Sequence, residues 1–286
     1  MASVFRLLPG VVVALGLAGP SDAAGALTQE EITAHQVNIA GRQRMLSQRI
    51  LAAACLTGRG ADAQAQSQIL ADAVQDFATG LDTLENGRVA DGLPPLAAPA
   101  ARAKLEDQRR AWTAFAQFTG PAAAGDAGAL AALAAAAPPL LASAVATVGA
   151  LAGGDSAGAQ ADLARYVDLA GRQRLLSQRL VGAACLGAAG ISVPETQAAI
   201  GKDLAEFEAN LTALADGDPS RGIAQAPSLD MRMALETIPE WWQPVRGFAV
   251  SAQATPLDAA SLSAMAEAYE PLLERLEEAV WMAGEV

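Results

Sequence analysis

Two stretches of the chain carry arginine, glutamine, serine and glycine at the same spacing. The first is NIAGRQRMLSQRILAAACL at 38–56 and the second is DLAGRQRLLSQRLVGAACL at 168–186. A guanidinium group donates forked hydrogen bonds to planar oxyanions, and these bonds are strong because the donor is charged. The chemistry that the two stretches suggest is therefore the binding of a small anion.

Each stretch is predicted to be helical, because alanine, arginine, glutamine and leucine favour a helix more than one internal glycine opposes it. One apolar stripe of the first helix should face the core of its own bundle. This stripe is formed by Ile39, Leu46, Ile50 and Ala53.

A second stripe follows alternating steps of four and three residues, which is the pattern of a seam between two helices. In the first stretch it holds Val37, Gly41, Arg44, Gln48, Leu51 and Cys55, and in the second Val167, Gly171, Arg174, Gln178, Val181 and Cys185. If the two helices pack side by side and parallel, Arg44 faces Arg174.

Two facing arginines in a partly dry seam need a counter-charge. The segments 32–61 and 169–194 contain no Asp or Glu, in a chain that has 31 acidic residues. We therefore expect no carboxylate near the seam and a small oxyanion between the arginines. The predicted ligand-binding residues are Gly41, Arg44, Gln48, Gly171, Arg174 and Gln178.

A simpler alternative is that the arginines are exposed and only extend past the apolar stripe into solvent. We favour it for Arg42 and Arg49, which point away from the seam on a helical wheel. For Arg44 and Arg174 we favour anion binding, because the seam position and the acid-free surroundings coincide in both copies.

The composition predicts an all-α protein: 52% of the residues are hydrophobic but only 4% are aromatic. The net charge of −12 argues against nucleic acid as a partner. The motifs of enzymes and cofactor sites are absent, Ser47 and Ser177 have no neighbouring base, and His35 is the one histidine. We expect no catalytic residues, no metal and no cofactor.

The duplication extends beyond the motif, because an offset of 130 also pairs Phe77 with Phe207 and Trp112 with Trp242. Two units are predicted at 27–153 and 157–286, with the GGDSAG stretch between them. Helical periodicity recurs four times in each unit, which predicts two tandem up-and-down four-helix bundles. The expected helices are 28–57, 62–86, 100–119 and 127–151, then 158–188, 194–215, 228–250 and 257–283.

The first residues are typical of a secretory signal peptide at 1–23, with Arg6 before a short apolar run and small residues near Ala23. The mature protein is expected to be periplasmic or secreted. It is also expected to lack a membrane span, since the most apolar later segment, 129–152, contains Pro138 and Pro139.

Cys55 and Cys185 are the two cysteines and hold equivalent seam positions. In an exported protein they can form a disulfide if the motif helices are parallel and in register. Two small buried thiols are an equally compatible interpretation.

The motifs NIAGRQRMLSQRI and DLAGRQRLLSQRL resemble the PilJ-type sensor domain, found at the N-terminus of type IV pilus methyl-accepting chemotaxis transducers. That domain is related to the periplasmic sensors of nitrate and nitrite histidine kinases, which are four-helix bundles that bind the anion between the first helices of a homodimer. The resemblance places the anion-contacting glycine and arginine of those sensors at Gly41 and Arg44, and again at Gly171 and Arg174. The motif is nearer to the form found in the pilus transducers.

The resemblance implies a stand-alone sensor module in which duplication has fused the two halves of a dimer, with nitrate or nitrite as the first ligand to consider. This chain departs from the receptors in having no kinase and no signalling coiled coil. An alternative is a periplasmic interaction module that docks a membrane-bound sensor or transducer and has no small ligand. A parallel homodimer of whole chains, with each Arg44 facing its own copy, is a further possibility.

Overall fold

The computed structural model describes residues 27–152, 159–226 and 228–284. The predicted signal peptide at 1–23 and the GGDSAG stretch at 153–158 lie outside these residues.

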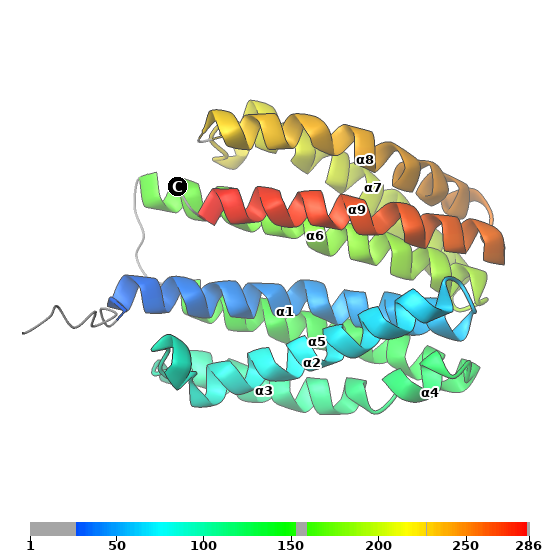
Figure 1. Ribbon diagram of the computed structural model, residues 1–286, viewed down its shortest axis with the longest axis horizontal. Helices are drawn as coiled ribbons and strands as arrows, with labels where there is room; N and C mark the ends of the chain where they lie inside the picture. Colours follow the sequence, from blue (N-terminus) through cyan, green and yellow to red (C-terminus); the bar gives the residue numbers. More distant parts are fainter. Residues whose placement is uncertain (1–26, 153–158, 227, 285–286) are drawn as a thin grey trace, which may run out of the picture.

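The chain folds into two four-helix bundles that lie side by side (Figure 1). Bundle one consists of α1 (Gln29–Gly58), α2 (Ala63–Asn86), α3 (Pro99–Ala116) and α5 (Ala127–Ala152), with a short α4 (Thr119–Ala123) after α3. Bundle two consists of α6 (Ala159–Ala188), α7 (Val193–Asp216), α8 (Leu229–Ala254) and α9 (Ala259–Gly284). The prediction of an all-α fold with two tandem bundles is confirmed.

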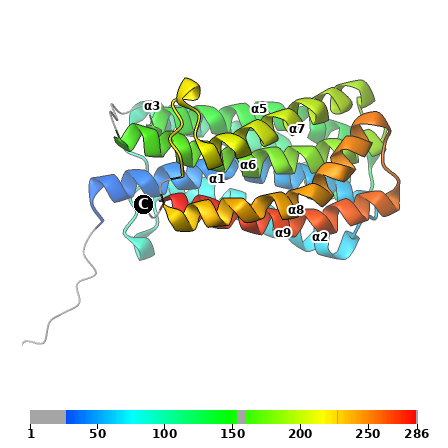
Figure 2. The same ribbon diagram turned by 90° about the horizontal axis from the view of Figure 1, so that it is seen from above.

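Helices α1 and α6 form the main contact between the bundles. In bundle one, α1 packs against α2 and α5, and in bundle two α6 packs against α7 and α9. The two helices also pack against each other. The axes of the long helices of both bundles are roughly aligned in both views (Figure 2). Each motif helix therefore buries two faces, one in its own bundle and one at the contact.

The start and the core face of α1 follow from local sequence. Thr28 and Glu31 form a capping box, in which the Thr28 hydroxyl accepts from the Glu31 amide and the Glu31 carboxylate accepts from the Thr28 amide. Leu46, Ile50 and Ala53 are buried, and Ile39 packs partly buried against the same core. This agrees with the predicted core stripe.

The two repeats use the same aromatic pair at the same place. Phe77 stacks on Trp112 with a centroid distance of 4.2 Å, and Phe207 stacks on Trp242 at 4.0 Å. Each pair joins the second and third long helices of its bundle. The pairing predicted from the offset of 130 thus corresponds to equivalent positions in space.

The loops between the second and third long helices are also equivalent. Each contains a short 3₁₀ helix, η1 (Val89–Asp91) or η2 (Pro219–Arg221), enclosed by an isolated β-bridge, Arg88 to Leu93 or Asp218 to Ile223. Both α2 and α7 end at a glycine with positive φ, Gly87 or Gly217, a conformation that L side chains rarely adopt. These bridges were not predicted from the sequence, because an isolated bridge is too short to show the alternation of apolar and polar residues that marks a strand.

The short α4 has no counterpart in bundle two and was not predicted. It packs against the end of α1, where a Cβ on Gly58 would lie 2.3 Å from the carbonyl oxygen of Ala122. The residue of repeat two at the equivalent position is Ala188. Gly58 therefore allows an approach of α4 to α1 that bundle two does not have.

One described helix, α5 at Ala127–Leu151, is long and apolar enough to cross a membrane by length and composition alone. In the structure it packs against α1, α3 and α4. Its buried residues follow steps of three and four, which is the pattern of a bundle core helix. They are Leu130, Leu133, Ala137, Leu140, Ala144 and Thr147.

Candidate functional site

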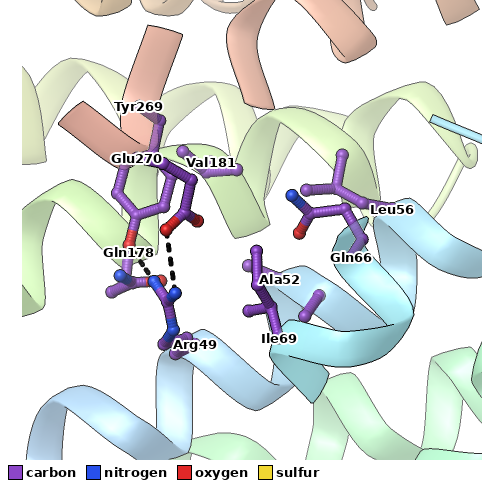
Figure 3. Close-up of a pocket in the computed structure, with 10 residues that line it drawn as sticks. Arg49, Ala52, Leu56, Gln66, Ile69, Gln178, Val181, Tyr269 and Glu270 are labelled. Atoms are coloured by element: carbon purple, nitrogen blue, oxygen red, sulfur yellow. Dashed lines mark hydrogen bonds and ion pairs between the residues drawn. The ribbon is translucent and has the colours of Figure 1, made fainter. Parts of the chain in front are cut away.

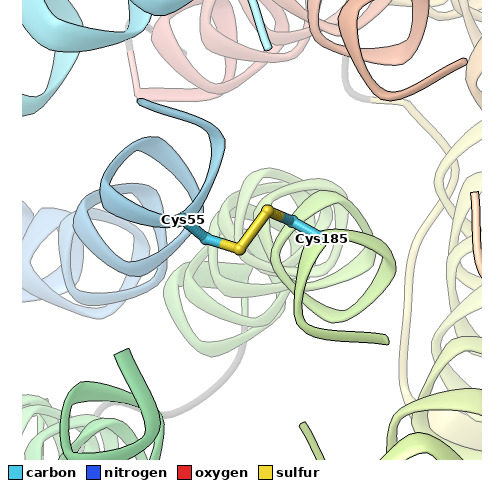
Figure 4. The surroundings of a disulfide bond; sticks show 2 residues. All are labelled: Cys55 and Cys185. Carbon is cyan, nitrogen blue, oxygen red and sulfur yellow. A yellow bond between two sulfur atoms is a disulfide. The ribbon is translucent and has the colours of Figure 1, made fainter. Parts of the chain in front are cut away.

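The two motif helices lie parallel and in register. A disulfide joins Cys55 of α1 to Cys185 of α6, with Cα atoms 6.1 Å apart (Figure 4). The sequence separation of the two cysteines is 130 residues, the same as the offset between the motifs. Equivalent residues of the two motifs therefore face each other within one chain.

The guanidinium groups of Arg44 and Arg174 converge on one glycine. A Cβ on Gly171 would lie 3.7 Å from Nη2 of Arg174 and 3.9 Å from Nη2 of Arg44. A Cβ on Gly41 would lie 3.7 Å from Nη2 of Arg44. The structure thus brings together four of the predicted site residues, Gly41, Arg44, Gly171 and Arg174.

The glycines leave space beside the arginines. Around Gly41 and Gly171 the nearest atoms to an added Cβ are at ordinary contact distance, so packing in this structure does not demand glycine at either position. A glycine inside a helix still costs about 1 kcal/mol relative to alanine. The structure therefore has room for at least a Cβ beside the guanidinium groups.

Arg44 has a carboxylate partner. Its Nη1 lies 2.8 Å from Oδ1 of Asp168, on the opposite helix α6. The prediction that no carboxylate lies near the seam is wrong, because the acid-free segments were measured along the sequence while Asp168 reaches Arg44 across the contact. A helical side chain leans toward the N-terminus of its helix, which is the direction of Asp168.

Carboxylates from other helices also pair with the remaining arginines of the motifs. Arg42 pairs with Asp76, Arg49 with Glu270, Arg172 with Glu206 and Arg179 with Asp203. Arg174 is the motif arginine that forms no ion pair with another described residue.

Arg174 is a poorly solvated cation without a hydrogen-bond partner for its buried Nε atom. Burial lowers the pKa of its guanidinium, the charge of Glu277 acts in the opposite direction, and the charges of Arg42 and Arg44 lower the pKa further. Arginine stays protonated at neutral pH all the same. Glu277 compensates this charge only from beyond ion-pair distance, so an anion at the site would stabilise it further.

The two predicted glutamines lie one turn after the arginines. Gln48 is buried and its Nε2 donates to the Ser47 hydroxyl, whereas the buried Gln178 has no partner for its amide oxygen or nitrogen among the described residues. The hydrogen bonds of the described residues connect neither glutamine to Arg44 or Arg174. A role for Gln48 and Gln178 in ligand binding stays a prediction.

Arg49 is partly buried between the bundles, so its predicted position in solvent is wrong. Its guanidinium donates to the Glu270 carboxylate at 2.8 Å and to the Tyr269 hydroxyl at 3.2 Å, both on α9. Figure 3 shows these groups close to Gln178. The space that they line has no room for a water molecule. Arg42, in contrast, is exposed as predicted.

Sequence reasoning missed the carboxylates near the motif arginines, which are Asp76, Asp168, Asp203, Glu206, Glu270 and Glu277. All of them except Asp168 lie outside the motifs, on helices whose position the motif does not specify. Asp168 could have been noticed, because it begins the second motif where the first has Asn38.

The arrangement suits binding rather than catalysis. Among the described residues, no group of three or more His, Cys, Asp or Glu side chains could hold a metal ion. The seam brings together two guanidinium groups, which bind anions but do not readily give up a proton, and the Asp168 carboxylate, which is paired with Arg44.

The model of one protein family matches both halves of the chain. It describes the N-terminal domain of type IV pili methyl-accepting chemotaxis transducers, PilJ, and it matches residues 26–138 and 158–268. Each match begins at a motif helix and covers most of one bundle. A search of the curated proteins found no match.

Proposed function

The chain belongs to the PilJ family of chemotaxis-transducer sensor domains, as two tandem copies, and from this premise we propose that it binds a small anion between α1 and α6. Nitrate or nitrite is the first ligand to test. The proposal assigns Arg44 and Arg174 as the anion-contacting residues, with Gly41 and Gly171 leaving room for the ligand.

The observation that carries the proposal is Arg174. It is partly buried, has no ion pair among the described residues and lies near a second arginine. Such an arrangement is unfavourable unless an anion joins it. A planar oxyanion has enough acceptor lone pairs for both guanidinium groups, and each charge-assisted hydrogen bond contributes roughly 1.5–3 kcal/mol.

The fused arrangement explains why the motif occurs twice. In a symmetric dimer, one motif helix would come from each subunit, whereas here α1 and α6 of one chain supply both halves. A homodimer with Arg44 against its own copy would need the face of α1 that α6 already covers.

We also propose that the protein is exported and works outside the cytoplasm. The support is the Cys55–Cys185 disulfide, because structural disulfides persist mainly in oxidising compartments. Detection of the mature protein in a periplasmic or culture fraction would test this point, and its retention in the cytoplasm would contradict it.

The test of anion binding is thermal unfolding of the disulfide-bonded protein in nitrate, nitrite, sulfate and chloride at matched ionic strength. Ligand at one hundred times its dissociation constant adds about 2.7 kcal/mol to the free energy of unfolding. We expect nitrate or nitrite to raise the melting temperature, and both Arg44→Ala and Arg174→Ala to abolish the rise. Equal melting temperatures in all salts would reject the proposal.

A second candidate is the docking of a membrane-bound sensor or transducer. Helix α8 exposes four large apolar side chains, Leu229, Met233, Trp241 and Val250. The equivalent residues of repeat one are Pro99, Ala103, Ala111 and Gly120. Exposed apolar groups gathered on one element can mark a protein interface. Capture of a transducer that Trp241→Ala abolishes, without any anion-specific stabilisation, would favour this function.

A further inference from the structure

The two halves of the proposed anion site differ at one charged position. Asp168 precedes Arg174 by six residues in the second motif, and Asn38 holds the same place before Arg44 in the first. The predicted site residues Gly41, Arg44 and Gln48 are otherwise matched by the same residue types in the second motif. A site made of two equal halves would present two positive charges, so Asp168 breaks the charge symmetry.

Asp168 neutralises one of the two site arginines. Its carboxylate lies 2.8 Å from the Arg44 guanidinium, which leaves Arg174 as the cation without an ion pair among the described motif residues. Three other charges act on Arg174 without forming an ion pair with it: Glu277 stabilises the cation, whereas Arg42 and Arg44 destabilise it. Arg42 is itself paired with Asp76. The site as a whole therefore carries about one uncompensated positive charge at most.

Asp168 is not locked in the core. Its side chain is 54% exposed while that of Arg44 is 17% exposed. It also lines an open hollow of about 490 Å³ on bundle two, together with Arg172 and Arg221. Replacement of Asp168 should therefore leave the packed core undisturbed.

We propose that Asp168 determines the charge of the ligand, so that the site accepts singly charged oxyanions in preference to doubly charged ones. The inference rests on the proposed function, because it concerns the same site. A dianion would bring a second negative charge close to the Asp168 carboxylate, and this repulsion is strong where the surroundings are partly dry. A monoanion suits a site in which Arg174 is the arginine without an ion pair among the described residues.

The test compares nitrate with sulfate in the full disulfide-bonded chain by calorimetric titration at matched ionic strength. The decisive variant is Asp168→Asn, which gives both motifs the same residue at this position. Glu208→Gln is the control, because it removes a carboxylate that lies 2.6 Å from an exposed arginine outside the motifs, Arg246.

We expect the wild-type protein and Glu208→Gln to prefer nitrate, and Asp168→Asn to bind sulfate more tightly than wild type by on the order of tenfold. Nitrate binding with the same nitrate-to-sulfate ratio in wild type and Asp168→Asn would overturn the inference and leave the proposed function standing. No anion binding by either protein would overturn both.

Discussion

Cys55 and Cys185 hold the same position in the two repeats and are bonded to each other across 130 residues of chain. The bond ties α1 to α6 near the C-terminal ends of both helices. Because it closes such a long loop, it limits the freedom of the unfolded chain as well as holding the two bundles together.

We predict that reduction of this disulfide lowers the free energy of unfolding by about 2–4 kcal/mol, the usual range for native disulfides. The measurement is urea unfolding with and without a reducing agent. A Cys55→Ser, Cys185→Ser double variant should unfold at the reduced midpoint in both buffers. Identical midpoints for oxidised and reduced wild-type protein would contradict the prediction.

Arg174→Met should stabilise the protein in buffer free of oxyanions, by about 1 kcal/mol, because an apolar side chain of similar length replaces a buried cation without a partner. The same variant should lose all anion-dependent stabilisation. The control is Arg172→Met, since Arg172 is exposed and paired with Glu206, and its effect should be small. A marked loss of stability in Arg174→Met would show that the cation is already compensated.

The pairs Arg49–Glu270 and Arg42–Asp76 have the same 2.8 Å separation but different exposure. The side chains of the first pair are 16% and 31% exposed, and those of the second 51% and 45%. Double-mutant cycles to alanine should give a coupling of about 1.5–3 kcal/mol for the first pair and at most about 1 kcal/mol for the second. Equal coupling energies for the two pairs would mean that burial between the bundles does not strengthen the ion pair.

Asp203 is predicted to make stability depend on pH. Burial raises the pKa of its carboxyl to about 6, and the nearby Arg179 only partly offsets this. The folded state therefore binds the proton more tightly than the unfolded state does. Stability that this group contributes in acid is lost as the pH rises from about 4 to above 6, by up to roughly 3 kcal/mol at 1.36 kcal/mol per pKa unit.

The measurement is the free energy of unfolding of wild type and Asp203→Asn across that range. As the pH rises, we expect the free energy of unfolding of wild type to fall relative to that of Asp203→Asn. Parallel curves would show that Asp203 keeps an ordinary pKa in the fold. The equivalent residue of repeat one is Ala73, so this pH effect should belong to bundle two alone.

The sequence by itself determined the eight long helices and the repeat, and it predicted a seam on each motif helix. Helical periodicity and the alternating steps of four and three are local properties, and they identified the core stripe of α1 and its seam with α6. The offset of 130 residues then placed Arg44 near Arg174 and Cys55 near Cys185, since equivalent positions of parallel helices meet in register.

Only the tertiary structure decided which charges compensate each other. Asp168 lies on the opposite motif helix from Arg44, and Glu270 reaches Arg49 from α9, so neither partner appears at a fixed spacing in the sequence. The short α4 and the burial of Arg49 also depend on how helices approach each other. An ion pair needs two atoms within a few ångströms, and that distance is set by packing between helices and not by position along the chain.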